Sequence, residues 1–360
     1  SSDWLATQII DMLDPAKYEE DSFLNLNYQI MQREHAAVVK TIAEKCGNSG
    51  AVISRKLLRT GDMSEIAAPV MYNLKTHKPP GRVGFRVIHA NGKFPFAPLG
   101  RRLSLILRRK LRLHRYVCID SDSFLRDVRN LVIGPEDRLI KIDVREFFMS
   151  GEHVQLAEAA SYFAEDGWQL IAKYVATYLL SMQYVQVKDE LGRPRLFKVG
   201  RGAGQGLTCA GDLANAAYAK TVEIPLLEES SDYELNQFYG IRLWRRVYDD
   251  IFIVARADEG RIRTLLARMK RLSAMWSYDD IEIYRDKVDF LDIHLFRCGD
   301  RLHYAPYVKP TSTGVPLSTL SVHPGHVHIM WMKSRIGTFA RRSSTHKIFV
   351  DARSQFIARL

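Results

Sequence analysis

Cysteine and long apolar runs are both scarce in this chain of 360 residues, and each scarcity excludes a class of protein. No apolar run approaches the roughly 18 residues of a membrane-spanning helix, so we expect no membrane partner. The chain begins with Ser-Ser-Asp-Trp, without an initiator Met or a signal peptide, which indicates a piece of a longer protein. The cysteines are too scattered for a disulfide framework or a zinc-binding cluster, and they are typical of a reducing intracellular setting: Cys46, Cys118, Cys209 and Cys298.

Acidic residues are in the minority. The chain has 52 Lys and Arg against 41 Asp and Glu, which gives a net charge of +11 and favours a polyanionic partner without identifying it. The sequence has no internal repeat and no low-complexity linker, and 46% of its residues are hydrophobic. The composition therefore predicts one interlocked globular protein of about two or three subdomains.

Two adjacent acidic residues, Asp249 and Asp250, interrupt an apolar, β-branched stretch at residues 246–254. The pattern predicts a strand, a tight turn and a second strand, with both carboxylates at the turn. Taken alone, such a pair is typical of a solvated hairpin turn. Far earlier in the chain, however, Asp143 ends another strand-like run at residues 139–144. Three carboxylates on neighbouring strand ends would suit a hard divalent cation, which prefers oxygen ligands.

Two basic segments precede the acidic residues. Short apolar runs around a Pro-Pro-Gly turn predict a β-hairpin from residue 69 onward, whose basic side chains either hold a triphosphate or form a solvated face: Lys75, Lys78 and Arg86. Residues 101–115 contain no acidic residue and predict an amphipathic basic helix that can bind a membrane surface, a partner or a phosphate backbone. The neighbouring motifs favour nucleic acid for the arginines of this helix: Arg101, Arg102, Arg108, Arg109 and Arg112.

The remaining patterns predict helices, strands and one glycine-rich loop. Helices are expected at 28–42, 124–131, 154–163, 168–182, 260–276, 331–341 and 345–360. Strands are expected at 184–187, 196–199, 281–284 and 288–295, the first two forming a hairpin. The glycine-rich segment 200–211 precedes a helix of small residues and would let the backbone approach a substrate closely, although it lacks the lysine of a Walker loop.

In chain order these blocks resemble the motif series of reverse transcriptases, and in detail that of Penelope-like retroelements, over roughly residues 70–345. The catalytic blocks that carry the resemblance are Lys75-Thr-His-Lys78-Pro79, Phe85-Arg86-Val-Ile88, Asp143-Val-Arg-Glu-Phe-Phe148, Gly202-Ala-Gly-Gln-Gly206 and Val247-Tyr-Asp-Asp250. Three further blocks are not expected in generic reverse transcriptases: Phe290-Leu-Asp-Ile293, Tyr307-Val-Lys-Pro-Thr311 and Ser321-Val-His-Pro324. Several positions depart from the family pattern, among them Val247 in the place of an aromatic residue, but none removes an expected metal ligand.

The resemblance implies an α+β right-hand polymerase, in which an antiparallel palm sheet is backed by helices and preceded by a helical N-terminal extension. It assigns residues 1–68 to that extension, 69–138 to the fingers, 139–151 to the first catalytic strand of the palm, 152–200 to helices and a hairpin of fingers and palm, 201–300 to the palm and 301–360 to the thumb. Many relatives carry an endonuclease after the polymerase. None fits after residue 345, so we expect either that such a domain lies outside this chain, fused or separate, or that the protein belongs to a branch without it.

The implied activity is RNA-directed DNA polymerisation: a primer 3′-hydroxyl is extended with deoxynucleotides on an RNA or DNA template, in an RNA–DNA or DNA duplex. Asp143 and Asp249 are expected to bridge two Mg²⁺ ions, for which Mn²⁺ can substitute. The carbonyl of Val144 would assist the nucleotide-bound ion, and Asp250 the primer-side ion. The implied localisation is nuclear, from the substrate alone.

The resemblance also implies contacts to the nucleotide and to the nucleic acid. Phe148 matches the position whose ring excludes a 2′-hydroxyl, Arg86 with Lys75 or Lys78 would hold the triphosphate, and Gln205 and Gly206 would shape the nucleotide pocket. The expected nucleic-acid contacts outside the basic helix are Tyr248, Lys309 and His323. Two alternatives stay open: a telomerase-like or host-adopted enzyme, and a catalytically silent nucleic-acid-binding derivative, against which the intact set of three aspartates argues.

Overall fold

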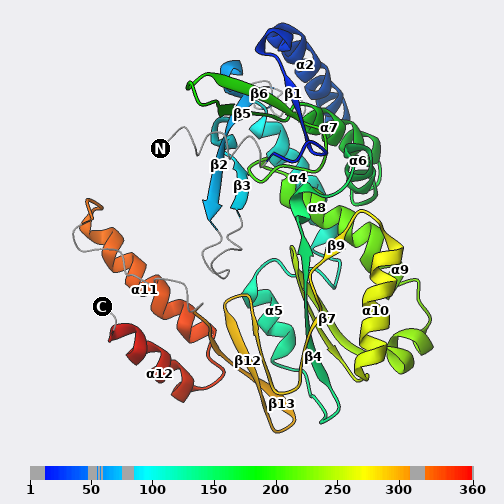
Figure 1. Ribbon diagram of the computed structural model, residues 1–360, viewed down its shortest axis with the longest axis vertical. Helices are drawn as coiled ribbons and strands as arrows, with labels where there is room; N and C mark the ends of the chain where they lie inside the picture. The colour runs from blue at the N-terminus through cyan, green and yellow to red at the C-terminus, as the bar shows by residue number, and fades with distance from the viewer. Residues whose placement is uncertain are drawn as a thin grey trace. The chain divides into compact units, whose positions relative to one another are not determined.

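The computed structural model describes residues 13–47, 55, 57, 60–74, 85–308 and 321–358. Within them the chain forms two compact units (Figure 1). The first unit comprises the described residues up to His114, together with Glu146–Glu229 and Arg271–Ser277. The second comprises Arg115–Arg145, Ser230–Lys270 and the described residues from Tyr278 onward.

The first unit contains a five-stranded sheet in the order β1-β6-β5-β2-β3. Its strands are β1 (Tyr18–Asp21), β2 (Ala67–Leu74), β3 (Phe85–His89), β5 (Tyr184–Lys188) and β6 (Pro194–Val199). All neighbours pair antiparallel except β2 and β5, which pair parallel. The predicted β5–β6 hairpin is confirmed, and β2 and β3 pair antiparallel as predicted, while the turn expected between them lies outside the described residues. Strand β1 was not predicted, because only one of its four residues is apolar and its pairing with β6 is long-range.

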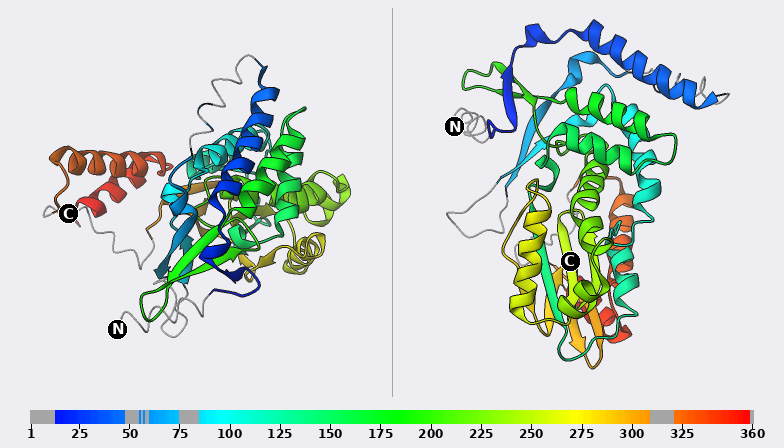
Figure 2. Two further views of the ribbon diagram at one scale, coloured as in Figure 1. Left: turned by 90° about the horizontal axis from the view of Figure 1, so that it is seen from above. Right: turned by 90° about the vertical axis from the view of Figure 1, so that its right-hand side faces the viewer.

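The first unit also contains the helices that Figures 1 and 2 show. They are α2 (Tyr28–Lys45), α4 (Ala97–Leu111), α6 (His153–Tyr162), α7 (Gln169–Ser181), α8 (Ala210–Tyr218) and α9 (Ile224–Leu227). A π-helical turn, Ala219–Glu223, joins α8 to α9, and short 3₁₀ turns occur at Phe23–Asn25, Met63–Ile66, Asn91–Lys93 and Phe147–Met149. The predicted basic helix is α4, whose apolar face is buried, with Leu99, Leu103 and Leu107 inaccessible to solvent. Amphipathic patterning therefore predicted α2, α6 and α7 closely, whereas α4 begins and ends four residues earlier than the predicted segment 101–115 and the short α9 was not predicted.

The second unit contains a four-stranded antiparallel sheet in the order β10-β4-β8-β7. Its strands are β4 (Arg138–Arg145), β7 (Ile241–Val247), β8 (Asp250–Ala255) and β10 (Glu282–Tyr284), and β9 (Ser277–Tyr278) also pairs with β4. The predicted arrangement of strand, tight turn and strand around the acidic pair is therefore confirmed. Every residue of β8 after Asp250 is buried, so this strand lies inside the unit rather than at its surface.

A second sheet in this unit consists of β11 (Lys287–Phe290), β12 (Ile293–Cys298) and β13 (Arg301–Pro306). The expectation of one strand over residues 288–295 is wrong, because the chain reverses at Leu291 and Asp292. Leu291 has a φ of 56°, in the left-handed region, which ends the strand locally. The apolar residues on either side then lie on paired strands instead of one extended strand.

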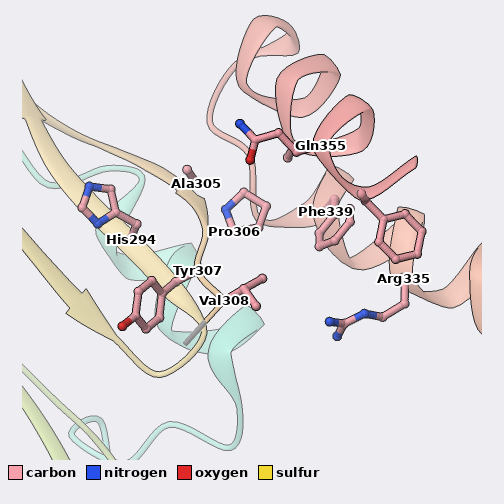
Figure 3. A pocket seen from close by; sticks show the side chains of 10 residues that line it. His294, Ala305, Pro306, Tyr307, Val308, Arg335, Phe339 and Gln355 are labelled. Carbon is pink, nitrogen blue, oxygen red and sulfur yellow. The ribbon is translucent and has the colours of Figure 1, made fainter. Parts of the chain in front are cut away.

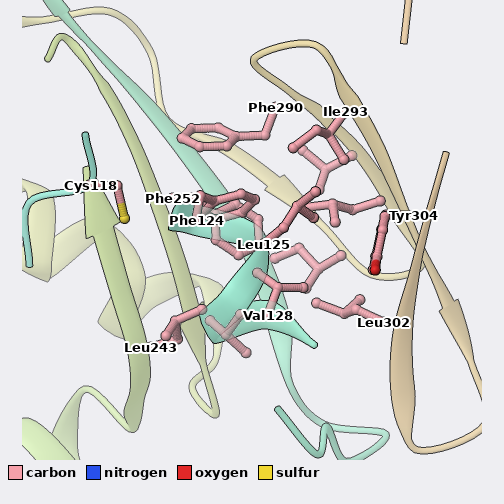
Figure 4. Packing of buried hydrophobic residues seen from close by; sticks show 14 of the residues in the cluster. Cys118, Phe124, Leu125, Val128, Leu243, Phe252, Phe290, Ile293, Leu302 and Tyr304 are labelled. Carbon is pink, nitrogen blue, oxygen red and sulfur yellow. The ribbon is translucent and has the colours of Figure 1, made fainter. Parts of the chain in front are cut away.

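Helix α5 (Ser121–Val128) lies between the two sheets and is capped as predicted. The carboxylate of Asp120 accepts a hydrogen bond from the Ser123 amide (2.7 Å), and the Ser123 hydroxyl accepts one from the Asp120 amide (3.0 Å). Phe124 packs against Phe252 of the larger sheet and Phe290 of the smaller one (Figure 4). One apolar core thus holds α5 and both sheets together.

The other regular elements of this unit are α10 (Glu259–Leu272), α11 (Gly325–Arg341), α12 (His346–Ile357) and a π-helical segment, Tyr233–Phe238. Helix α10 ends four residues earlier than predicted, and its apolar side, which includes Ile262 and Met269, is buried. No helix among the described residues is long and apolar enough to cross a membrane. The observed class is α+β, with antiparallel sheets backed by helices, as predicted.

Candidate functional site

Two of the three predicted aspartates lie directly opposite each other at one end of the sheet β10-β4-β8-β7 of the second unit. Asp143 of β4 pairs with Asp250, the first residue of β8. The amide of Val144 donates a hydrogen bond to the carbonyl of Asp249 (2.9 Å), so the third aspartate is joined to the same strand end. Side chains alternate along a strand, and Asp143 therefore lies on the same face of the sheet as Leu139, toward the core around α5.

The turn that carries Asp249 is held from both sides. Tyr248 has a φ of 53°, and its carbonyl accepts a hydrogen bond from the guanidinium of Arg246 (3.0 Å). Arg246 is fully buried, and its backbone pairs with the segment before α5 through Tyr116 (2.9 Å) and Cys118 (2.7 Å). Tyr248 itself packs partly against the core. The backbone at Asp249 is thus fixed by β7, β8 and residues 116–118.

A fourth carboxylate joins this strand end. The amide of Asp279 donates a hydrogen bond to the carbonyl of Asp143 (2.9 Å), and its side chain forms an ion pair with Arg145. The sequence interpretation missed Asp279. The available signal was the acidic pair at residues 279 and 280 directly after a short aromatic run, which repeats the pattern of the predicted site.

Electrostatic repulsion marks Asp143 as the centre of this group. Burial, followed by the charges of Asp249, Asp250 and Asp279, raises the pKa of Asp143 to about 6. Burial and like charges both disfavour the ionised form of a carboxyl group. No Lys or Arg forms an ion pair with the Asp143 carboxylate within the residues that the structure describes. An external cation would therefore relieve a repulsion that this strand end retains.

The donor set fits a hard divalent cation, although the side chains are not arranged around one. All the carboxylates at this strand end offer oxygen ligands, which Mg²⁺ prefers. Across the described residues, however, no three His, Cys, Asp or Glu side chains form a group that could hold a metal ion as they stand. The backbone places Asp143 opposite Asp250 and joins Asp249 to the same strand end. Their metal-binding role stays a prediction.

Phe148 lies on a 3₁₀ turn of the first unit that is fixed at several points. Glu146 begins the turn with a φ of 49°. The next residue, Phe147, is buried and stacks on Trp276 with the ring centroids 5.3 Å apart. The carbonyl of Phe148 accepts a hydrogen bond from the Ala203 amide (2.7 Å), while its own side chain is half-buried. These contacts fix the backbone of Phe148 beside the glycine-rich loop.

The glycines of that loop are required by its packing against β3. A Cβ atom on Gly204 would lie 1.9 Å from Nδ1 of His89, and one on Gly206 would lie 1.8 Å from the His89 carbonyl oxygen. The carbonyl of Gln205 accepts a hydrogen bond from the His89 amide (2.8 Å). The sequence interpretation attributed these glycines to the approach of a substrate. The structure accounts for them by contact with β3, and the roles of Gln205 and Gly206 toward a nucleotide stay predictions.

The arginines of α4 differ in their surroundings. Arg108 donates to both carboxylate oxygens of Asp212 (3.0 and 3.1 Å), and Arg109 to Glu165 (2.7 Å). The guanidinium of Arg102 lies over the ring of Trp168. Arg101 and Arg112 are exposed, and neither forms an ion pair in the described part of the chain. These last two are therefore the arginines of α4 best placed to meet an external polyanion.

The remaining predicted contacts are only partly described. Lys75, Lys78 and Lys309 lie outside the described residues, and so does the side chain of Arg86, whose backbone forms part of β3. His323 is exposed at the segment before α11 and contacts the hydroxyl of Ser321 (2.5 Å).

Comparisons with known proteins identify the fold. No protein-family model matches the chain, and no curated protein sequence matches it. Among solved structures, it is similar to telomerase from Candida albicans in complex with a TWJ fragment of telomeric RNA, with 14% identity, a TM-score of 0.54, and 80% of this chain matching 54% of that one. It is also similar to the BmCPV RNA-dependent RNA polymerase at the elongation state, with 10% identity, a TM-score of 0.51, and 93% of this chain matching 30% of that one.

These similarities define a class of fold. The chain has the right-hand polymerase fold that telomerase and viral RNA-dependent RNA polymerases share, as the sequence predicted. It spans about half the length of the telomerase chain that it matches.

Proposed function

We propose that this protein is a template-directed nucleic-acid polymerase, and specifically an RNA-directed DNA polymerase of the Penelope-like kind. The single observation that carries the proposal is the position of Asp143 directly opposite Asp250, with Asp249 joined to the same strand end. The right-hand fold supports it, because this arrangement occurs on the sheet that corresponds to a palm. The motif series of the sequence supports the finer assignment.

The residues of this strand end have distinct tasks in such a reaction. Asp143 and Asp249 would hold two Mg²⁺ ions together, with the Val144 carbonyl and Asp250 as further ligands. When bound, Mg²⁺ supplies positive charge to the phosphoryl oxygens as the primer hydroxyl replaces pyrophosphate. The pairing of β4 with β8 would keep Asp143 and Asp250 at one strand end, and the hydrogen bond from Val144 would keep Asp249 beside them.

Phe148 would choose between deoxynucleotides and ribonucleotides. Its carbonyl accepts a hydrogen bond from the Ala203 amide and its ring contacts the buried ring of Phe147, and both contacts would oppose its displacement by a 2′-hydroxyl. Arg86, with Lys75 or Lys78, would hold the triphosphate, and Arg101 and Arg112 would contact the template backbone. Recognition by charge and A-form shape would make binding weaken steeply with salt.

A second candidate within the same fold is an RNA-dependent RNA polymerase, which the similarity to the BmCPV enzyme favours. A telomerase-like or host-adopted reverse transcriptase is favoured by the similarity to the Candida albicans telomerase structure. Incorporation of ribonucleotides in place of deoxynucleotides would distinguish an RNA-dependent RNA polymerase from a reverse transcriptase. The preferred template bears on whether a reverse transcriptase is telomerase-like.

Primer extension tests the proposal directly. The purified chain is given a labelled primer on an RNA or a DNA template, with deoxynucleotides or ribonucleotides and with Mg²⁺ or Mn²⁺. We expect extension with deoxynucleotides on RNA, and its loss in the Asp249→Asn variant. Extension with ribonucleotides alone would favour the viral type of activity. No extension under any condition, from a folded protein that binds the duplex, would contradict a polymerase.

Phe148→Ala provides the matched test of sugar selection. The proposal expects ribonucleotide incorporation to rise at least about tenfold relative to deoxynucleotides, because the variant removes the ring that excludes the 2′-hydroxyl. Replacement of the neighbouring buried Phe147 is unsuitable as a control, since it would disturb packing on Trp276. Phe148→Tyr, which keeps the ring, serves instead and should retain the selectivity of the parent.

A further inference from the structure

The turn between β11 and β12 carries an aspartate whose role the polymerase chemistry does not use. Asp292 follows Leu291, which has a φ of 56°. Its carboxylate accepts a hydrogen bond from the Ser121 hydroxyl at the start of α5 (2.8 Å) and forms an ion pair with Arg342. Its carbonyl accepts a hydrogen bond from the Tyr307 amide at the end of β13 (2.9 Å). Asp292 therefore connects α5, the smaller sheet and the residue that follows α11.

Two arginines at the end of α11 meet two carboxylates. Arg341 forms an ion pair with Asp122 of α5 (3.0 Å), and Arg342 lies 3.9 Å from the same side chain in addition to its contact with Asp292. The side chain of Arg342 is only 14% exposed, so water screens its ion pairs less than those of a surface arginine. The charges thus fix the end of α11 to α5 and to the β11–β12 turn.

Hydrogen bonds of side chains and backbone attach the same junction to the core. Arg129 donates to the carbonyl of Arg341 (3.2 Å) and to the hydroxyl of Tyr304 (2.7 Å). The amide of Tyr304 donates to the Ser344 hydroxyl (3.1 Å), and the Ser344 amide donates to the carbonyl of Tyr304 (2.9 Å). Residues 341–344, which join α11 to α12, are therefore attached to the core by polar contacts of both main chain and side chains.

Away from this junction the two helices make little contact with the core. Phe339 is the one buried residue of α11, and Phe356 that of α12. A cavity of about 300 Å³ separates the helices from the end of β13, with Tyr307 and His294 on the sheet side and Arg335 on α11 (Figure 3). A helix pair that is attached at one end and beside a cavity takes its direction from the attached end.

We propose that Asp292 is a positioning residue that, through Arg342, sets the direction in which α11 and α12 extend from the second unit. The inference rests on the proposed function in one respect, which is that these helices contact a primer–template duplex. Helix α11 suits a phosphate backbone, since it has no acidic residue and, apart from Arg341 in its ion pair with Asp122, carries His326, His328, Lys333 and Arg335. Asp292 thereby affects how tightly the protein binds the duplex, whereas the carboxylates around Asp143 act on the reacting groups.

A distance measurement tests the direction of the helices without any assumption about activity. Exposed Cys298 at the end of β12 takes one spin label, and a cysteine in place of the exposed Met330 on α11 takes the other, in a Cys46→Ser background. We expect one narrow distance distribution in the parent. Arg342→Met and Asp292→Asn should each broaden or shift it, and Arg342→Lys should restore most of it. Arg263→Met, which removes the same charge from the exposed pair with Glu259, is the matched control.

Kinetics then test the consequence for nucleic acid. A labelled RNA–DNA duplex is released into excess unlabelled duplex, so that the dissociation rate is measured without catalysis. We expect Arg342→Met and Asp292→Asn each to raise this rate about tenfold, and the double variant to add little, because both act through one ion pair. If the protein extends primers, the products per binding event should shorten about tenfold, while the first nucleotide is added at the parental rate within about twofold.

The outcomes separate this inference from the proposed function. A parent that extends no primer contradicts the polymerase, yet the distance and dissociation measurements still decide the role of Asp292. Distance distributions and dissociation rates that match the Arg263→Met control would overturn the positioning role. So would an equal loss in the first addition step, which would place Asp292 among the residues that act on the reacting groups. If Arg342→Met fails to fold, Asp292→Asn and Arg342→Lys carry the test.

Discussion

The two ends of strand β4 hold aspartates in opposite electrostatic surroundings. Asp143, near the last residue of the strand, is surrounded by further carboxylates that help to raise its pKa to about 6. Asp137, directly before the first residue, is fully buried and forms ion pairs with Arg242 and Arg256 (3.3 Å to the latter). It also accepts a hydrogen bond from the Gly134 amide (2.7 Å). Arginines thus compensate the charge of Asp137, whereas no Lys or Arg forms an ion pair with Asp143 within the described residues.

This difference indicates which carboxylates are available for chemistry. Burial does not separate the two ends, since Asp137 is the more deeply buried aspartate. The sign of the neighbouring charges separates them, because arginines stabilise the ionised form and carboxylates destabilise it. A strained, like-charged group in a defined fold is a functional candidate, whereas a compensated one contributes to stability.

The largest expected effect concerns activity at the acidic end. Asp249→Asn should reduce primer extension by about 10³-fold or more, because a ligand of the activating cation is lost and such a ligand contributes several kcal/mol. Duplex affinity should stay within about twofold, as measured with a labelled primer–template. Extension that persists above a tenth of the parental rate would show that this carboxylate is dispensable.

The opposite end should respond in stability. Asp137→Asn should lower the free energy of unfolding by about 2–3 kcal/mol, since it leaves two arginines without their carboxylate. The loss falls below that of a fully buried pair because Arg256 is more than half exposed and solvent screens it. Denaturant unfolding measures the change. An unchanged unfolding midpoint would mean that the arginines find other partners.

Divalent cations should distinguish the two ends. At a Mg²⁺ concentration tenfold above its dissociation constant, we expect stabilisation of about 1.4 kcal/mol. It should appear as a higher unfolding temperature in the parent and in Asp137→Asn, and it should be lost in an Asp143→Asn/Asp249→Asn double variant. A similar rise in that double variant would indicate binding elsewhere on the chain.

The smallest expected effect is on the free energy of unfolding, and its sign differs between the two ends of β4. Without divalent cations, Asp143→Asn should raise the free energy of unfolding by about 1 kcal/mol, because it removes like-charge repulsion from a half-buried group. The same substitution at Asp137 should lower it. Both variants are compared in the presence of a chelator, and a loss of stability in Asp143→Asn would contradict a net repulsion among the carboxylates of this strand end.

Local patterns in the sequence predicted most of this fold. Apolar periodicity located the helices, and the Asp120 cap located the start of α5. The order of the motifs predicted a shared position for Asp143, Asp249 and Asp250. Such features depend on neighbouring residues, and the chain records them locally.

Features that depend on distant contacts were not predictable in this way. Strand β1 has little apolar pattern of its own and exists through pairing with β6. The reversal at Leu291 requires a left-handed residue that is not glycine, which no turn signal announces. The neutralisation of Arg108 by Asp212 joins residues more than a hundred positions apart. In each case the deciding partner lies elsewhere in the chain, and only the folded structure brings it near.

The pairing of β4 with β8 has a consequence for the aliphatic residues of these strands. A shift of the pairing by one residue would turn Asp143 to the opposite face and part it from Asp250. Apolar packing opposes the shift together with the backbone hydrogen bonds, since Ile251 and Ile253 of β8 and Ile140 and Ile142 of β4 are completely buried. Buried aliphatic residues far from any substrate therefore set the register that keeps Asp143 opposite Asp250. A change in their size would lower the catalytic rate before it unfolded the chain.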